Sequence, residues 1–226
     1  MPYRLCDEVS YCRVDDYLVF LDIRHDRYFR LSSSLEHAFL AHADGMGASG
    51  VDTNRLMDNE ILTGLPPGGD RTTNVSIADP LSSAIEQSIA IKELRPSQIL
   101  EAAIITLSTR WKLRTKELRE VLGSMRDYRD RYATRIASTK GASTRQDLAE
   151  TSAIFQRARR YVPIDTSCLL DSVAMVRFLA RKGLYSRLIL GVACDPFSAH
   201  CWVQAGDFVL NDTVGNAKLH TPIRVI

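Results

Sequence analysis

The sequence predicts an α+β protein with a small N-terminal winged-helix-like module and a larger domain in which a helix packs on an antiparallel sheet. Short runs of alternating apolar and polar residues fill positions 9–31, and such runs are typical of strands. A Gly- and Pro-rich stretch without periodicity follows at positions 63–80. The last third holds one strongly apolar helical segment and then three β-rich runs. We therefore expect domains at residues 1–65 and 81–226, joined by a flexible linker at 66–80.

The composition is that of a soluble globular protein, with 45% hydrophobic and 25% charged residues in a chain of 226. The formal net charge of +2 gives no overall attraction to nucleic acid or to an anionic membrane. The longest apolar stretch, residues 99–107, contains Glu101 and is too short to span a bilayer. The N-terminus lacks the apolar segment of a secretory signal. We expect a cytoplasmic protein whose five cysteines are free thiols.

Three strands separated by turn residues are predicted in the N-terminal module: Val9–Val14, Tyr17–Asp22 and Tyr28–Leu31. Ser33 and Glu36 stand at the spacing of a capping box, so a helix should follow the third strand. Residues 51–65 then predict one or two short helices whose apolar side includes Leu56 and Ile61. This order of elements is the outline of a winged helix, although an N-terminal subdomain of a single α+β protein fits equally well.

Winged helices often bind DNA, but this module carries the wrong charge for that function. Its last predicted helix has Asp52, Asp58 and Glu60 against Arg55, and the phosphates would repel it.

The middle of the chain predicts helices over residues 81–137 and 147–161. One of them begins near Ser97 and carries an apolar row: Ile99, Ala103, Ile104, Leu107 and Trp111. Basic residues cluster between positions 110 and 135, interleaved with acidic ones. We interpret this cluster as a solvated face with local ion pairs; a site for acidic partners or nucleotide phosphates is the less favoured alternative.

A cysteine begins the most apolar helix of the chain. The segment from Cys168 to Lys182 is apolar on one row and is followed by Gly183, a typical helix end. At the first turn, free backbone N–H groups and the helix dipole stabilise a thiolate, which lowers the pKa of the thiol. Cys168 is therefore a candidate nucleophile, and a buried structural cysteine is the alternative.

Two β-rich runs supply the partners that a thiol nucleophile needs. In the run at 199–204, His200 shares one face with Trp202 while Cys201 takes the other. If an antiparallel hairpin joins this run to the next, at 207–212, then Asp212 comes beside His200. A carboxylate there orients the imidazole and stabilises its charged form. The predicted site is thus Cys168, His200 and Asp212.

A metal site is the competing interpretation, since Cys168, Cys194, His200 and Cys201 are conceivable ligands. We expect no metal, because the chain has no Cys-x-x-Cys pair and His200 and Cys201 face opposite ways. The other histidines, His220 included, are interpreted as surface or structural residues. No P-loop or dinucleotide-binding glycine pattern occurs.

Four segments resemble the C-terminal signature of the lasso-peptide B proteins, bacterial maturation proteases with a transglutaminase-like, papain-related fold. They are Cys168-Leu-Leu-Asp-Ser-Val-Ala, Ser186-Arg-Leu-Ile-Leu-Gly-Val, Pro196-Phe-Ser-Ala-His-Cys-Trp-Val and Val209-Leu-Asn-Asp. The resemblance implies that Cys168, His200 and Asp212 are the catalytic residues. Cys201 departs from the family pattern, in which a small residue is more usual. The N-terminal module is similar in architecture to PqqD-like precursor recognition domains.

The resemblance also implies a substrate and partners. The N-terminal module would bind the leader of a ribosomally made precursor through Arg27, Tyr28, Phe29, Arg30 and Leu31, with Leu56 and Ile61 beside them. The Cys168 site would cut leader from core, and an asparagine-synthetase-like cyclase would receive the core. No cofactor is expected on this chain, and the ATP dependence of the family would lie with the cyclase.

Two alternatives stay open at the level of the residues. The same three residues could transfer an acyl group to an amine, as in transglutaminases or arylamine acetyltransferases. The chain could instead be a peptide-binding scaffold without catalysis.

Overall fold

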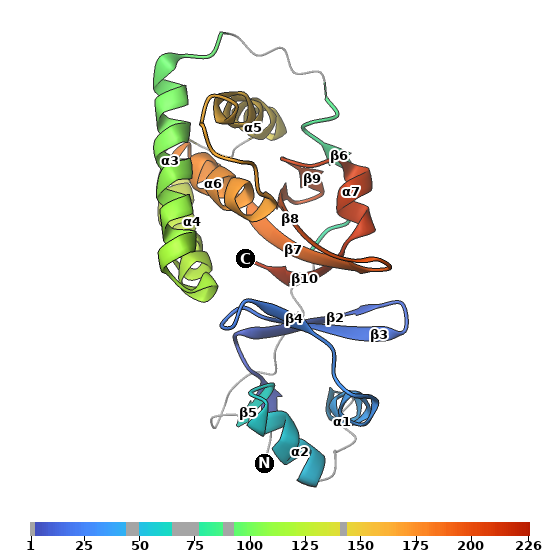
Figure 1. The fold of residues 1–226 in the computed structure, drawn as a ribbon. Helices are drawn as coiled ribbons and strands as arrows, with labels where there is room; N and C mark the ends of the chain where they lie inside the picture. Colours follow the sequence, from blue (N-terminus) through green and yellow to red (C-terminus); the bar gives the residue numbers. More distant parts are fainter. Residues whose placement is uncertain (1–2, 44–49, 65–76, 88–92, 141–143) are drawn as a thin grey trace. The chain divides into compact units, whose positions relative to one another are not determined.

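The computed structural model describes residues 3–43, 50–64, 77–87, 93–140 and 144–226. The chain folds as two compact units, Met1–Ser76 and Ile77–Ile226. Helices and sheets occur in both units (Figure 1), which confirms the α+β class.

The first unit contains two small antiparallel sheets and two helices. Its elements are β1 (Tyr3–Leu5), β2 (Val9–Val14), β3 (Tyr17–Asp22), β4 (Arg27–Phe29), α1 (Ser33–Ala43), α2 (Gly50–Asp58) and β5 (Leu62–Gly64). Strands β2, β3 and β4 form an antiparallel meander in that order, and β1 pairs with β5. Asp15 and Asp26 adopt positive φ angles of 52° and 50° in the two meander turns, a conformation that aspartate tolerates better than most residues.

An aromatic cluster holds the first unit together. Phe20 of β3 is fully buried, stacks on Phe29 at 5.4 Å and meets Phe39 of α1 edge-on at 5.0 Å. Leu56 and Ile61 belong to the same core. The helices therefore cover the face of the meander that carries Leu18 and Phe20.

The second unit packs helices against a mixed sheet. Its elements are β6 (Ser82–Ser83), α3 (Pro96–Thr115), α4 (Leu118–Lys140), α5 (Arg145–Arg159), α6 (Cys168–Arg181), β7 (Arg187–Cys194), β8 (Phe197–Ala205), β9 (Phe208–Val209), α7 (Val214–Leu219) and β10 (Thr221–Val225). The strand order is β10-β7-β8-β9-β6, antiparallel except for the β6–β9 pair. Helix α6 contacts β7 and β8 as well as α3, α4 and α5 (Figure 1), so it is the central element of this unit.

The sheet departs from the sequence expectation after β9. We expected a strand through Asp212, but β9 ends at Val209. The Asn211 side chain accepts a hydrogen bond from the Val203 backbone N–H at 2.7 Å, in the position where a neighbouring strand would supply a carbonyl. The chain is thereby released from the sheet, and Asp212 lies in the turn that leads into α7. Neither α7 nor β10 was expected from the sequence.

Helix α3 also differs from the usual amphipathic arrangement. It buries Ala102, Ile105, Thr106 and Thr109, whereas Ile104, Leu107 and Trp111 of the expected apolar row are more than half exposed. Within the described residues, no helix has the length and apolar character that crossing a membrane requires.

Candidate active site

Cys168 is the first residue of α6 and is exposed, while the helix behind it is almost wholly buried. The loop before it is held by Arg159, whose side chain is 7% exposed. The Arg159 guanidinium donates to the carbonyl oxygens of Val162, Ile164 and Asp165 at 3.2, 3.0 and 3.0 Å. The loop's approach to Cys168 is therefore defined by one buried cation.

The same arginine is tied to the start of the helix. Its Nε donates to Oδ1 of Asp171 at 2.6 Å, and Oδ2 of Asp171 accepts the Ser167 backbone N–H at 3.2 Å. Asp171 thus satisfies a free N–H group in the residue before Cys168 and places negative charge in the first turn, where the helix dipole favours it.

His200 comes from β8, directly opposite Gly191 of β7. Its Nε2 lies 2.5 Å from Oδ2 of Asp212, to which it donates a hydrogen bond. Burial raises the pKa of Asp212, but hydrogen bonds from His200, the Thr213 backbone N–H and Asn216 outweigh it and hold that pKa below its ordinary value. The carboxylate is thus ionised and fixed beside the imidazole, an arrangement that stabilises imidazolium.

The Cys168 thiol and the His200 imidazole shift each other's pKa. Hydrogen bonds from the Cys201 thiol and from His200 lower the pKa of Cys168 to about 4, against an opposing effect of burial. Hydrogen bonds to Asp212 and Cys168 raise the pKa of His200 to about 9. Near neutral pH the pair is therefore thiolate and imidazolium. Because Nε2 of His200 is used by Asp212, the ring nitrogen available to Cys168 is Nδ1.

Cys201 lies on the face of β8 that meets α6, because its side chain is buried and its thiol interacts with Cys168 and Ser172 of that helix. The opposite face carries His200, whose ring is 6.3 Å from that of Trp202. The expected alternation of side chains along β8 therefore holds. Cys168, at the start of α6, nevertheless interacts with both His200 and Cys201. The hydrogen bond to Cys168 and burial raise the pKa of Cys201, so this thiol stays protonated and acts as a donor.

Asn216 was missed from the sequence, because α7 was not expected. Its Nδ2 lies 2.9 and 3.1 Å from the two carboxylate oxygens of Asp212. The backbone carbonyl oxygen of Asn216 accepts a hydrogen bond from Nδ1 of His220 at 3.0 Å, and Nε2 of His220 accepts one from Ser198 Oγ at 3.0 Å. His220 is 9% exposed and its ring lies 5.1 Å from that of His200. His220 is therefore a satisfied residue, as expected, and it also lies in the surroundings of the site.

Asn211 connects the site to α6. It accepts from the Val203 backbone and donates to Ser172 Oγ at 2.7 Å. Ser172 stands one helical turn after Cys168, so this contact fixes the rotation of the helix against the strand that carries His200. Within the described part of the chain, no cluster of three or more His, Cys, Asp or Glu side chains could hold a metal ion.

The residues expected to bind a leader fall into two groups in the first unit. Arg27, Tyr28 and Phe29 form β4, an edge strand of the meander, and Arg30 follows with its guanidinium 3.7 Å from the centre of the Tyr17 ring. Leu31 packs partly buried against the core. Leu56 and Ile61 are 0% and 1% exposed, so they support this unit from inside and offer no surface to a ligand.

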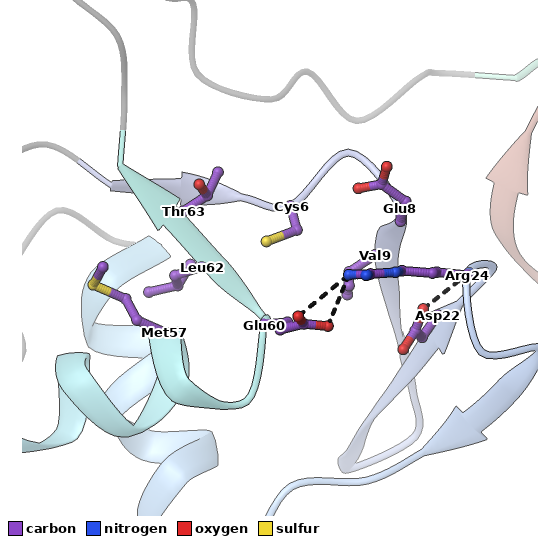
Figure 2. Close-up of a pocket in the computed structure, with 9 residues that line it drawn as sticks. All are labelled: Cys6, Glu8, Val9, Asp22, Arg24, Met57, Glu60, Leu62 and Thr63. Atoms are coloured by element: carbon purple, nitrogen blue, oxygen red, sulfur yellow. Dashed lines mark hydrogen bonds and ion pairs between the residues drawn. The ribbon is translucent and has the colours of Figure 1, made fainter.

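A pocket of about 320 Å³ lies in the same unit (Figure 2). Its lining consists of Cys6, Glu8, Val9, Asp22, Arg24, Met57, Glu60, Leu62 and Thr63. Figure 2 shows the Arg24 guanidinium reaching Glu60, with both carboxylate oxygens at 3.2 Å. Three carboxylates against one guanidinium make the lining acidic.

The second unit is similar in sequence to a known protein family. A family model described as the transglutaminase-like superfamily matches residues 109–225, more than half of the chain. The microcin J25-processing protein McjB of Escherichia coli is 38% identical over 47 residues, which is 21% of this chain and 23% of that protein. This match therefore spans less than a quarter of the relative's length. No solved structure matches.

Proposed function

Because this chain belongs to the transglutaminase-like superfamily, we propose that it is a cysteine peptidase that separates leader from core in a ribosomally made lasso-peptide precursor. One arrangement carries the proposal: an exposed thiol at a helix start, with its pKa lowered to about 4, is hydrogen-bonded to an imidazole that a carboxylate holds. The local similarity to a microcin-processing protein supports a peptide precursor as the substrate.

In the proposed reaction, the Cys168 thiolate attacks the carbonyl carbon of the scissile peptide bond. His200 gives its proton to the leaving nitrogen, so the C–N bond breaks and the leader remains as a thioester on Cys168. Neutral His200 then takes a proton from water, whose oxygen displaces the thiolate and releases the leader as a carboxylic acid. Asp212 keeps the imidazole oriented throughout. The backbone N–H of Cys168 at the helix start is suited to stabilise the oxyanion.

Leader recognition is assigned to the first unit as a PqqD-like, winged-helix-like domain, residues 1–65, with 66–80 as linker and 81–226 as the peptidase domain. Strand β4 is an edge strand, and an extended leader can add to such an edge. Arg27, Tyr28, Phe29, Arg30 and Leu31 would then contact the leader. The acidic pocket of Figure 2 would accept one basic or amide side chain of the leader.

The product of cleavage determines which enzyme can act next on the core peptide. Hydrolysis frees the N-terminal amine of the core, which an asparagine-synthetase-like cyclase would consume in ring closure in the bacterial cytoplasm. The proposal assigns no cofactor to this chain, so any use of ATP would belong to the cyclase.

The test is cleavage of the precursor by the purified full chain, followed by mass spectrometry. Wild-type protein should release leader and core whose summed mass exceeds the precursor by one water, and Cys168→Ala should release neither. Cleavage that survives in Cys168→Ala would contradict the proposal. An amide adduct of the leader with an added amine, formed in place of hydrolysis, would assign acyl transfer instead.

A scaffold without catalysis is separated from an enzyme by thiol reactivity. Iodoacetamide near neutral pH should label Cys168 faster than Cys6, because the pKa of Cys168 is lowered while burial raises that of Cys6. Equal labelling rates in the native protein would favour the scaffold.

A further inference from the structure

Helix α3 has two faces, and the larger apolar side chains are on the outer one. Its inner face consists of the buried residues Ala102, Ile105, Thr106 and Thr109. On the opposite side, Leu100, Ile104, Leu107 and Trp111 are 62%, 56%, 51% and 62% exposed. Their spacing of four, three and four residues places them in one row along the helix, which we call the outer stripe. A helix in a globular protein ordinarily shows the reverse pattern.

The inner face holds α3 in this orientation. Arg177 of α6 donates to Thr109 Oγ1 at 2.6 Å and to Ser108 Oγ at 3.0 Å. Glu101 pairs with Arg181 at 2.9 Å and with Lys182 at 2.7 Å. These polar contacts would all be lost if the helix rotated to bury the outer stripe. The stripe therefore stays on the surface of this unit, and contiguous exposed apolar surface usually marks an interaction site.

Basic residues follow one edge of the outer stripe. Arg110 and Arg114 lie on that edge by helical periodicity, and neither has an ion pair among the described residues. The opposite edge carries the neutral Ser97, Ser108 and Thr115, with Lys112 further from the stripe and Glu101 paired with Arg181 and Lys182. A partner that covers the stripe would thus meet unpaired positive charge nearest to it along the edge of Arg110 and Arg114.

We propose that the outer stripe of α3 is a docking surface for an amphipathic helix of a second protein, apolar on one face and acidic along one flank. Residues at i, i+4, i+7 and i+11 are the anchors by which one helix recognises another. The acidic flank would pair with Arg110 and Arg114. This inference does not depend on the peptidase assignment.

A second copy of this chain fits the surface poorly. In an antiparallel two-fold pair centred on the stripe, the same edges of the two helices meet, so Arg110 and Arg114 would lie opposite Pro96, Ile99 and Ala103 of the copy, none of which is acidic. In a parallel pair, that edge would meet Ser108, Lys112 and Thr115, none of which is acidic. Unpaired or like charges at an interface disfavour association, so the partner is expected to be a different protein.

The test uses the full chain and a fluorescent synthetic helix of about five turns, with leucines on one face and glutamates along one flank. A matched peptide carries lysine in place of glutamate. Fluorescence anisotropy should show saturable binding of the glutamate peptide, with the lysine peptide at least about tenfold weaker. Leu107→Glu and Trp111→Glu should each weaken binding by about tenfold or more. Leu81→Glu, at a position 68% exposed outside α3, is the control and should not.

Charge reversal sharpens the test. The double variant Arg110→Glu with Arg114→Glu should bind the lysine peptide and lose the glutamate peptide. The proposal is overturned by the absence of saturable binding, by binding that Leu107→Glu leaves unchanged, or by equal affinity for both peptides. Sedimentation that shows a wild-type dimer, dissociated by Leu107→Glu, would overturn it in favour of a second copy.

Discussion

Nδ2 of Asn216 lies 2.9 Å from Oδ2 of Asp212, the oxygen that also accepts the hydrogen bond from His200 at 2.5 Å. The carboxylate of Asp212 is therefore held from two sides, by the imidazole and by an amide from α7. Replacing Asn216 by Ala would leave only His200 and the Thr213 backbone N–H to hold the carboxylate, so Asp212 should be positioned less firmly beside His200.

We expect Asn216→Ala to lower kcat by about tenfold to hundredfold with little change in KM, because the geometry of the imidazole is relaxed while the substrate surface is intact. Asn59→Ala, which removes an exposed amide from the first unit, is the matched control. Cleavage kinetics on the precursor measure both variants. Unchanged kcat in Asn216→Ala would show that Asp212 is held without its help.

The thiolate–imidazolium pair predicts the pH profile of kcat/KM. Activity should fall below about pH 4, where Cys168 is protonated, and above about pH 9, where His200 has lost the proton that the leaving amine needs. Asp212 is the largest cause of the raised pKa of His200, so Asp212→Asn should move the basic limb to lower pH. A basic limb that stays in place in Asp212→Asn would argue against this assignment.

Cys201 is expected to tune the nucleophile. Its thiol is the first cause of the lowered pKa of Cys168, so Cys201→Ala should raise the pKa of Cys168 and slow its alkylation in mildly acidic solution. Cys201→Ser keeps a donor and should preserve most of the effect. Titration of the thiolate ultraviolet absorbance measures the pKa, and Cys194→Ala serves as the control. If Ala and Ser behave alike at position 201, the hydrogen bond is not the cause.

Arg159 is expected to matter for stability and for the position of Cys168 together. Arg159→Lys keeps the charge but cannot reach Asp171 and three carbonyl groups at once. We expect the free energy of unfolding to fall by about 2 kcal/mol or more, and cleavage to be reduced at temperatures where the variant is folded. Arg160→Lys, at the exposed neighbouring position, should change the free energy by less than about 0.5 kcal/mol. Chemical denaturation compares the two.

Gly191 of β7 lies opposite His200 and close to the side chains of Trp202 and His220. A Cβ atom there would lie 2.7 Å from Cζ3 of Trp202 and 3.1 Å from Cβ of His220. Gly191→Ala should therefore lower the free energy of unfolding by about 1–3 kcal/mol. Gly123→Ala in α4 meets no atom within 4 Å and should be neutral or stabilising by up to about 1 kcal/mol. Equal effects of the two substitutions in thermal unfolding would contradict the crowding at Gly191.

The local sequence pattern was sufficient to predict the elements that depend on residues close together in the chain. The meander of the first unit follows from short β-rich runs and from the turn residues between them, such as Asp15 and Asp26. Helix α6 follows from its apolar row, and its start at Cys168 follows from the residues that precede it. The α3 row was also visible in the sequence, but periodicity alone does not tell which face of a helix is covered.

The sequence by itself determined that a thiol stands at a helix start, that His200 and Cys201 point to opposite faces of a strand, and that a carboxylate follows on the next run. These are consequences of helix and strand periodicity, which depend only on neighbours in the chain. The tertiary structure decided that Cys168 meets both His200 and Cys201, that Asn211 ends β9 in place of a continuing strand, and that Asn216 holds Asp212. It also decided that α3 buries Ala102, Ile105, Thr106 and Thr109 and leaves its larger apolar row exposed. Each of these outcomes depends on how α6, β8 and α7 pack, and packing joins residues whose separation along the chain carries no periodic signal.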